Sequence, residues 1–196
     1  MGEFNNTTGI NSFYRTAISR GFARDFQFRV IQMGRWLLTD EMLYLETASM
    51  PGRTINSIQV PYLGLNFQVP GAANYNSNNG WQVTFRCDET LQVRNFLETW
   101  SYNIFDDRTS KGANLPSNSA DHLVELVAID NLGNARKRLQ LFGAWCQQVG
   151  DLQYSLAGTG NIVKINATIA YQFWRPVDSA YYPPAQPGDP RIESAD

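Results

Sequence analysis

The hairpin that decides the fold class is residues 123–142, which read LVELVAIDNLGNARKRLQLF. Apolar and polar residues alternate on both sides of a central Asn131-Leu132-Gly133-Asn134 segment. An alternation with a period of two residues is typical of a half-buried strand, and Asn and Gly supply the backbone conformations that a tight turn requires. The sequence therefore predicts two antiparallel strands, Leu123–Ile129 and Ala135–Phe142, joined by a turn.

The same two-residue period recurs along the chain on either side of this hairpin. It is clearest at Trp81–Cys87, where apolar residues alternate with Gln82, Thr84 and Arg86. Pro61 lacks an N–H group and predicts an edge, a bulge or a break in the extended region around it. The other strands or extended segments that the pattern predicts are Phe26–Ile31, Met42–Ala48, Thr54–Val60, Tyr62–Val69 and Ile162–Trp174.

One segment has a helical period instead. Between Asp88 and Phe105, apolar residues recur every three or four positions, which places them on one face of a helix. Asp88 is suited to capping the start, because its carboxylate accepts hydrogen bonds from the unpaired N–H groups of the first turn. This is the one long helix that the sequence predicts. Its apolar residues are Val93, Phe96, Leu97, Trp100 and Ile104.

The elements run strands, helix, strands, without the strand–helix alternation that is typical of a parallel sheet. We expect a mainly β protein, an antiparallel β-sandwich or barrel of about seven strands with one packed α-helix. Residues 20–175 would form this domain, between an N-terminal arm (1–19) and a proline-rich extended tail (176–196). Loops are expected at 71–80 and 106–121. Strand edges left unpaired should be covered by a neighbouring subunit.

Composition excludes several classes of function. The 196 residues include 16 basic and 18 acidic ones, and a formal charge of −2 does not indicate a strongly basic nucleic-acid-binding protein. No apolar run reaches the ~20 residues that cross a bilayer, and the polar N-terminus has no signal-peptide core. Cys87, Cys146 and the single histidine, His122, are too few for a disulfide framework or a zinc site. We expect buried free thiols, a strand-end histidine, and no metal, cofactor or catalytic residue.

Two charged features have both a structural and a functional interpretation. The carboxylate pairs Asp88/Glu89 and Asp106/Asp107 flank the predicted helix, and we interpret them as caps and solvated ends rather than as a catalytic pair. Basic residues at 136 and 138 share a strand face, which indicates either a solvated sheet surface or a polar surface past which nucleic acid slides. Tight DNA binding needs more positive charge than this chain has.

Several short motifs follow one another in a definite order. Phe22-Ala23-Arg24 precedes the first strand, and Met50-Pro51 follows the second. The later motifs are Ile58-x-Val60-Pro61-Tyr62-x-Gly64, Asn66-Phe67-x-Val69-x-Gly71, Trp81-x-Val83-Thr84-Phe85, Arg94-Asn95-Phe96, Gly143-x-Trp145, Val149-Gly150-Asp151-Leu152-Gln153 and Tyr171-x-Phe173-Trp174. In order and spacing this set resembles the tail tube proteins of contractile-tailed bacteriophages. Those proteins are related to pyocin tubes and to the haemolysin-coregulated tube protein of type VI secretion.

That resemblance implies the phage tail tube fold and a structural subunit that is not an enzyme. It implies rings of six subunits whose sheets join into one barrel around a central channel, with the rings stacked inside a contractile sheath. The implied partners are further copies of the chain, the tail sheath protein, the baseplate and tail terminator proteins, the tape measure protein and, transiently, DNA in the channel. The implied location is the tail tube of the virion, assembled in the cytoplasm of the host bacterium.

The resemblance also assigns residues to surfaces. The strands that tend to line the channel in this family would here be 42–48, 54–60, 123–129 and 135–142. The implied channel-lining residues are Glu46, Glu125, Arg136, Arg138 and Gln140. Segments 51–71 and 71–80 would contact neighbouring subunits or rings, and a packed local core is the alternative for Phe67. The implied contact residues are Tyr62, Leu65, Phe67 and Tyr75.

Other functions stay open at this point. The chain fits a baseplate protein that initiates the tube, or a tube protein of the type VI or pyocin kind. From a different class, a β-sandwich carbohydrate-binding module would carry its aromatic residues on an exposed platform.

Overall fold

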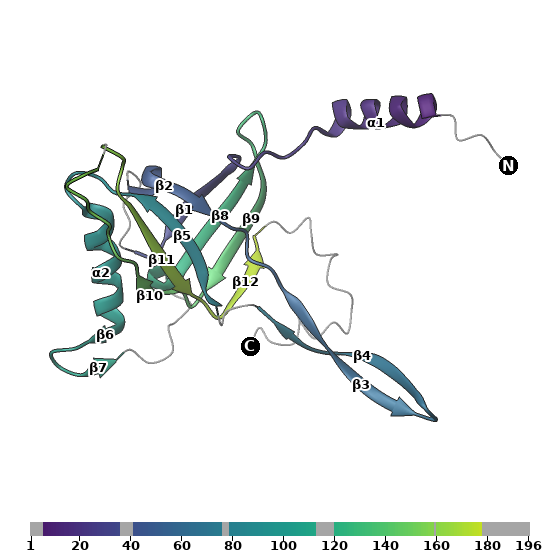
Figure 1. The fold of residues 1–196 in the computed structure, drawn as a ribbon. Coiled ribbons are helices and arrows are strands. Elements are labelled where there is room, and N and C mark those ends of the chain that lie inside the picture. Colours follow the sequence, from purple (N-terminus) through teal and green to yellow (C-terminus); the bar gives the residue numbers. More distant parts are fainter. Residues whose placement is uncertain (1–5, 36–40, 76–78, 113–119, 159, 178–196) are drawn as a thin grey trace.

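The computed structural model describes residues 6–35, 41–75, 79–112, 120–158 and 160–177 (Figure 1). Sheet A contains four antiparallel strands in the order β1 (Phe28–Met33), β8 (Leu123–Ile129), β9 (Ala135–Phe142) and β12 (Phe173–Pro176). Sheet B has the order β10 (Trp145–Val149), β11 (Lys164–Ala170), β5 (Trp81–Arg86) and β2 (Leu45–Ala48), and is also antiparallel. The mainly β, antiparallel fold class is confirmed, and the β8–β9 hairpin has the predicted bounds.

Two further pairs of strands lie outside these sheets. β3 (Thr54–Tyr62) and β4 (Leu65–Asn74) form a two-stranded ribbon that projects from the rest of the molecule (Figure 1). Its tip is Leu63-Gly64, where both residues have positive φ, as a tight two-residue hairpin turn requires. β6 (Phe105–Asp106) and β7 (Lys111–Gly112) form a short hairpin. The described residues thus contain twelve strands rather than about seven, because many of them are short.

The hydrophobic core lies between sheets A and B. Trp81, Val83 and Phe85 of β5 point inward and are at most 2% exposed, as the two-residue period predicts. They lie opposite Ile169, Ala167 and Ile165 of β11, which are equally buried. Sheet A completes the core with Val124, Leu126, Leu139 and Leu141.

Helix α2 (Gln92–Ile104) closes part of this core. It packs against β10 and buries Val93, Phe96, Leu97 and Trp100, so the predicted apolar face is confirmed. The carboxylate of Asp88 accepts hydrogen bonds from the backbone N–H groups of Gln92 (3.1 Å) and Val93 (3.4 Å). These bonds satisfy donors that the first helical turn leaves unpaired, so the capping role predicted for Asp88 is confirmed.

Three sequence expectations are wrong. Helix α1 (Asn6–Arg20) is a second long helix, in a mostly polar segment whose few apolar residues have helical spacing. The expected strand Ile162–Trp174 is two strands, because the chain leaves sheet B after Ala170 and enters sheet A at Phe173. Strand β10 was not predicted, since a register shift between Cys146 and Gln148 interrupts its alternation.

Smaller differences concern where elements begin and end. Phe26 is 64% exposed and precedes β1, and a 3₁₀ helix, Glu41–Tyr44, precedes β2. The loop expected at 71–80 begins four residues late, because β4 continues to Asn74. A second 3₁₀ helix, Ala120–His122, precedes β8. Of the expected loop 106–121, residues 113–119 lie outside the described residues, as do residues 1–5 of the arm and the tail after 177. Neither described helix is long and apolar enough to span a membrane.

The two thiols are free, and the protein buries them to different degrees. Cys146 is 2% exposed in the core, whereas Cys87 at the end of β5 is half-buried. Burial raises the pKa of the Cys146 thiol from 9.0 to about 12, because the core solvates a thiolate poorly.

This raised pKa predicts a loss of stability in alkaline solution. Between pH 9 and 12 the unfolded chain loses the Cys146 proton while the folded chain keeps it, so stability falls as the pH rises. The slope contributed by this thiol is at most about 1.4 kcal/mol per pH unit. The measurement is urea unfolding of wild type and of Cys146→Ala between pH 8 and 10.5, roughly the range over which the slope develops. It gives the slope of the free energy of unfolding against pH for each protein. The variant should show the smaller slope, and equal slopes would contradict the assignment.

Candidate assembly surfaces

The β3–β4 ribbon has one apolar and one polar face. Ile58, Val60 and Tyr62 of β3 lie opposite Val69, Phe67 and Leu65 of β4 and share a face by strand alternation. The other face carries Ser57, Gln59, Pro61, Asn66, Gln68 and Pro70. Every residue of β3 is exposed, and the six apolar side chains are between 43% and 64% exposed. The rest of the described chain therefore leaves this apolar face uncovered.

The ribbon brings together three of the four residues that the sequence suggested for contacts between subunits. Tyr62 and Leu65 are direct cross-strand neighbours, and Phe67 lies one pair further along the same face. The alternative of a packed local core is wrong for Phe67, which is 53% exposed.

Tyr75, the fourth of these residues, lies elsewhere. Its ring packs edge-on against Trp174 at 5.8 Å and lies 6.4 Å from Phe173, so strand β12 covers part of it. The guanidinium of Arg53 lies 5.7 Å from the same ring on the other strand leading into the ribbon. Tyr75 thus helps to hold the base of the ribbon against sheet A.

The two sheets end in four edge strands, β1 and β12 in sheet A and β2 and β10 in sheet B. Within the described residues, each of them pairs with a strand on one side only. Three of the four have a register shift, at Val30/Gln32 in β1, at Leu45/Thr47 in β2 and at Cys146/Gln148 in β10. The outer backbone groups of an edge strand are available for pairing with another chain.

The outer face of sheet A carries most of the residues suggested for the channel. Glu125 on β8 accepts a hydrogen bond from the Gln140 amide at 3.2 Å and forms an ion pair with Arg138 at 3.8 Å, both on β9. Arg136 lies apart from this cluster. It forms a 2.8 Å ion pair with Asp130, whose carboxylate also accepts hydrogen bonds from the backbone of the β8–β9 turn.

Glu46 lies on sheet B. Its carboxylate accepts a 2.6 Å hydrogen bond from Lys164 of β11 and lies 3.5 Å from Arg86 of β5. The hydrogen bond from Lys164 and the neighbouring positive charges lower the pKa of Glu46 below its ordinary value of 4.5. The structure therefore does not bring Glu46 together with Glu125, Arg138 and Gln140, because the outer faces of the two sheets point in opposite directions.

Around Glu46, the outer face of sheet B is polar throughout its two central strands. Gln82, Thr84 and Arg86 of β5 lie opposite Thr168, Asn166 and Lys164 of β11, and the Thr84 hydroxyl donates to the Asn166 side chain at 2.9 Å. The polar half of each alternation was visible in the sequence. The missing information was that these two strands are neighbours, which makes one continuous surface.

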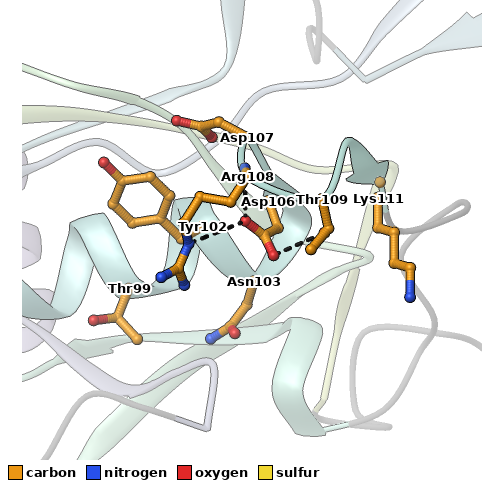
Figure 2. Close-up of a pocket in the computed structure, with 9 residues that line it drawn as sticks. Thr99, Tyr102, Asn103, Asp106, Asp107, Arg108, Thr109 and Lys111 are labelled. Atoms are coloured by element: carbon orange, nitrogen blue, oxygen red, sulfur yellow. Dashed lines mark hydrogen bonds and ion pairs between the residues drawn. The ribbon is translucent and has the colours of Figure 1, made fainter.

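A hollow beside the end of α2 is lined by described residues of the helix end and of the β6–β7 hairpin (Figure 2). Asp106 there accepts hydrogen bonds from the Thr109 hydroxyl at 2.8 Å and from the Arg108 backbone at 3.0 Å. The Thr109 bond is the main cause of a lowered pKa for this carboxyl. Asp106 thus stabilises the β6–β7 turn, in agreement with its interpretation as a helix-end residue.

Other polar candidates also have structural roles in the described part of the chain. His122 Nδ1 lies 3.1 Å from the Ala144 carbonyl oxygen at the start of β8, where a strand-end histidine was expected. Across the described ranges no three His, Cys, Asp or Glu side chains are grouped to hold a metal ion. Of the described tryptophans, Trp81 and Trp100 are buried and Trp145 and Trp174 are half-buried, so they form no exposed platform of the kind a carbohydrate-binding module needs.

Comparison with known proteins decides the family. A sequence profile described as phage tail tube protein matches residues 32–176, which include both sheets, the ribbon and α2. The chain belongs to the phage tail tube protein family. Its role is therefore that of a structural component of a tail tube. No curated protein sequence matches the chain.

Solved structures with similar folds come from contractile injection systems. A chain of the anti-feeding prophage tube-terminating cap has a TM-score of 0.57 and 10% identity, over 80% of this chain and 91% of that one. A chain of the anti-feeding prophage baseplate, solved with 6-fold symmetry, has a TM-score of 0.54 and 15% identity over 80% and 95%. A chain of the sheath–tube complex of an extracellular contractile injection system, PVC, has a TM-score of 0.53 and 12% identity over 83% and 95%. At these identities the similarity shows the fold.

The charge cluster on sheet B gives a testable pKa. Glu46 should titrate below pH 4.5, so its contribution to stability is complete above that pH and is lost as the pH falls through the lowered value. Lys164→Gln should raise the pKa of Glu46 toward 4.5, and the matched variant Arg86→Gln should raise it less, because Lys164 is the stronger influence. NMR titration of the Glu46 carboxyl carbon checks both. An unchanged pKa in Lys164→Gln would contradict the ion pair.

Proposed function

We propose that this protein forms six-subunit rings that stack into the inner tube of a contractile tail, with a central channel through which DNA passes during ejection. The observation that carries the proposal is the ribbon: its six apolar side chains are exposed, the described residues of the same chain do not cover them, and a neighbouring subunit would do so. Membership of the tube family supports the same conclusion. The proposal requires no cofactor and no catalytic residue.

Strand directions in both sheets are compatible with closed rings. The four strands of each sheet alternate in direction, so the two edge strands of one sheet run in opposite directions. When one edge of a subunit meets the other edge of its neighbour, the new pair is antiparallel like all the rest. The same head-to-tail contact repeated around an axis yields a ring.

Sheet B is the sheet that we propose lines the channel. The chain passes directly from its edge strand β2 into the ribbon and returns from the ribbon to β5, so both strands of the ribbon connect to this sheet, while Tyr75 packs the base of the ribbon against β12 of sheet A. Docking of the ribbon on a neighbour therefore places the β2 edge at a subunit boundary, where sheet B can continue from one subunit into the next.

The chemistry of sheet B also fits the passage of DNA. Its outer face has mostly uncharged polar side chains, and Glu46 compensates part of the charge of Lys164 and Arg86. Within the described residues, the outer face of sheet A carries Arg29, Arg136, Arg138 and Arg175, of which Arg136 pairs with Asp130 and Arg138 with Glu125. The affinity for phosphate grows with every uncompensated cation. Stacked rings with sheet A facing the channel would therefore retain DNA, whereas stacked rings with sheet B facing the channel would let DNA slide. Of the residues suggested from the sequence, this arrangement keeps Glu46 in the channel.

Further partners follow from assembly into a tail. The related structures contain tube, sheath, baseplate and terminating-cap components, which supports contacts with a sheath, a baseplate and a terminator here as well. We assign the tape measure protein to the channel before ejection, and assembly to the host cytoplasm. A specialised ring at the baseplate is the second candidate, because both the baseplate and the cap of the anti-feeding prophage contain chains of this fold.

Electron microscopy of concentrated purified protein tests ring formation. Wild-type protein should form rings or tubes of constant bore. Phe67→Glu should remove them, since a charge on the apolar face cannot be buried in a contact. Gln68→Glu, on the opposite face of the same strand, should assemble like wild type. Circular dichroism should show that the wild type and both variants are folded. A monomer at every concentration in wild type would contradict the proposal.

Chemical labelling of assembled tubes tests which sheet lines the channel. Asn166→Cys on sheet B and Gln140→Cys on sheet A are compared in a Cys87→Ser background. In tubes, a small maleimide should label both cysteines, whereas a maleimide attached to a polymer too large for the bore should label Gln140→Cys alone. Protection of Gln140→Cys with free labelling of Asn166→Cys would place sheet A in the channel instead.

A further inference from the structure

Helix α1 carries an apolar stripe that nothing in the described chain covers. Ile10, Phe13, Tyr14 and Ile18 recur at helical spacing and are between 60% and 69% exposed. Figure 1 shows α1 projecting away from the sandwich, and its recorded ring contact is with Phe22 in the adjacent linker at 6.2 Å. Since an isolated helix of this length is marginal in water, α1 needs a surface on which to pack.

The same chain has an apolar groove of matching size. It lies between the edge strands β1 and β2, where the two sheets of the sandwich open toward solvent, and has a volume of about 880 Å³. Its lining is largely apolar and includes Phe28, Val30, Ile31, Met42, Leu43 and Leu45. Leu43 is 81% exposed and Ile31 45% exposed, so part of the apolar lining of the groove is in contact with water.

The helix and the groove agree in dimensions and in charge. The stripe from Ile10 to Ile18 is about 12 Å long, and the four residues of β2 extend about 13 Å. A helix is about 10 Å across, which is also the usual distance between packed sheets. Residues 6–20 contain two arginines and no acidic residue. The charged residues that line the groove are Asp25, Arg29 and Glu46, and because the Glu46 carboxylate already pairs with Lys164, Asp25 provides the complementary charge.

The linker directs α1 away from its own groove. Gln27 is buried, donates a 2.6 Å hydrogen bond to Asn131 in the β8–β9 turn, and accepts one from the Arg24 backbone at 2.8 Å. Residues 24–27 are therefore fixed at the end of sheet A. To reach its own groove the helix would have to reverse direction within Gly21–Ala23, which spans at most about 10 Å.

We propose that α1 of one subunit packs its apolar stripe into the β1–β2 groove of a second copy of the chain. This inference rests on the proposed self-assembly and names the surfaces of one further contact between subunits. It gives each subunit a contact that is separate from the ribbon, because the stripe and the groove share no residue with the apolar face of β3–β4.

Disulfide trapping between two preparations of the full-length protein tests the contact. One carries Phe13→Cys and the other Leu43→Cys, both with Cys87→Ser, since Cys87 lies beside Leu43 at the surface; the remaining Cys146 is buried. Mixing under mild oxidation at assembly concentration should yield a dimer that contains both variants. Ser12→Cys on the opposite helix face, and Leu132→Cys in the β8–β9 turn as a distant partner, should each give about tenfold less.

The outcomes separate this inference from the proposed function. If wild-type protein forms tubes but Phe13→Cys does not cross-link to Leu43→Cys, the α1 contact is overturned and the ring proposal stands. If neither tubes nor cross-links form, both the α1 contact and the ring proposal are overturned. An intramolecular disulfide in the Phe13→Cys/Leu43→Cys double variant at high dilution overturns the contact between copies. So does equal cross-linking of Phe13→Cys to Phe67→Cys on the ribbon.

A functional variant completes the test. Phe13→Glu should raise the protein concentration needed for half-maximal assembly about tenfold, and Ser12→Glu should leave it unchanged. Both substitutions lie outside the sandwich core, so both variants should fold. A last measurement tests binding of the protein to vesicles of anionic and neutral phospholipid by sedimentation. If wild-type protein sediments with the vesicles, Phe13→Glu does not, and no cross-link between Phe13→Cys and Leu43→Cys forms, α1 binds a membrane surface and the proposal is overturned.

Discussion

A two-stranded ribbon has no second layer against which to bury its own side chains. This constraint leaves the apolar face of β3–β4 exposed, and the proposed contacts between subunits depend on that exposure. Each apolar side chain on the β3–β4 face forgoes roughly 1 kcal/mol of burial while it faces water. The sandwich cannot supply the cover, because the ribbon projects from it (Figure 1). The described part of the chain therefore folds around a core of its own and leaves these six side chains exposed.

The outer faces of the two sheets differ in their polar residues. On sheet A, charged side chains are partly committed to local structure, as when Arg136 joins Asp130 at the β8–β9 turn. On sheet B, short uncharged side chains such as Thr84 and Asn166 bond to each other across strands. A surface whose polar groups are already paired offers few bonds to a passing polyanion. If sheet B lines the channel as proposed, such a surface would hold passing DNA weakly.

The sequence was sufficient where local pattern decides the structure. The two-residue period located β5, β8 and β9, and the helical period located α2 with its cap at Asp88. It was insufficient where neighbours decide. Glu46 and Glu125 look alike as polar residues on strands, and only the pairing of β2 with β5 and of β8 with β9 places them on different sheets. Tyr75 follows the same rule, because its cover comes from Trp174, a hundred residues later. Helix α1 shows a different reason, since its stripe has the right spacing but no partner within the described chain.

The register shifts in β1, β2 and β10 have a geometric consequence. An extra residue on one strand of a pair bends that strand and increases the local right-handed twist. Sheet B has such an irregularity on both of its outermost strands, whereas the β5–β11 pair at its centre is regular. Curvature is thus concentrated where one molecule would join the next. This distribution of register shifts disfavours flat sheets that extend indefinitely, as in fibrils. It favours a contact between sheets that turns through a constant angle.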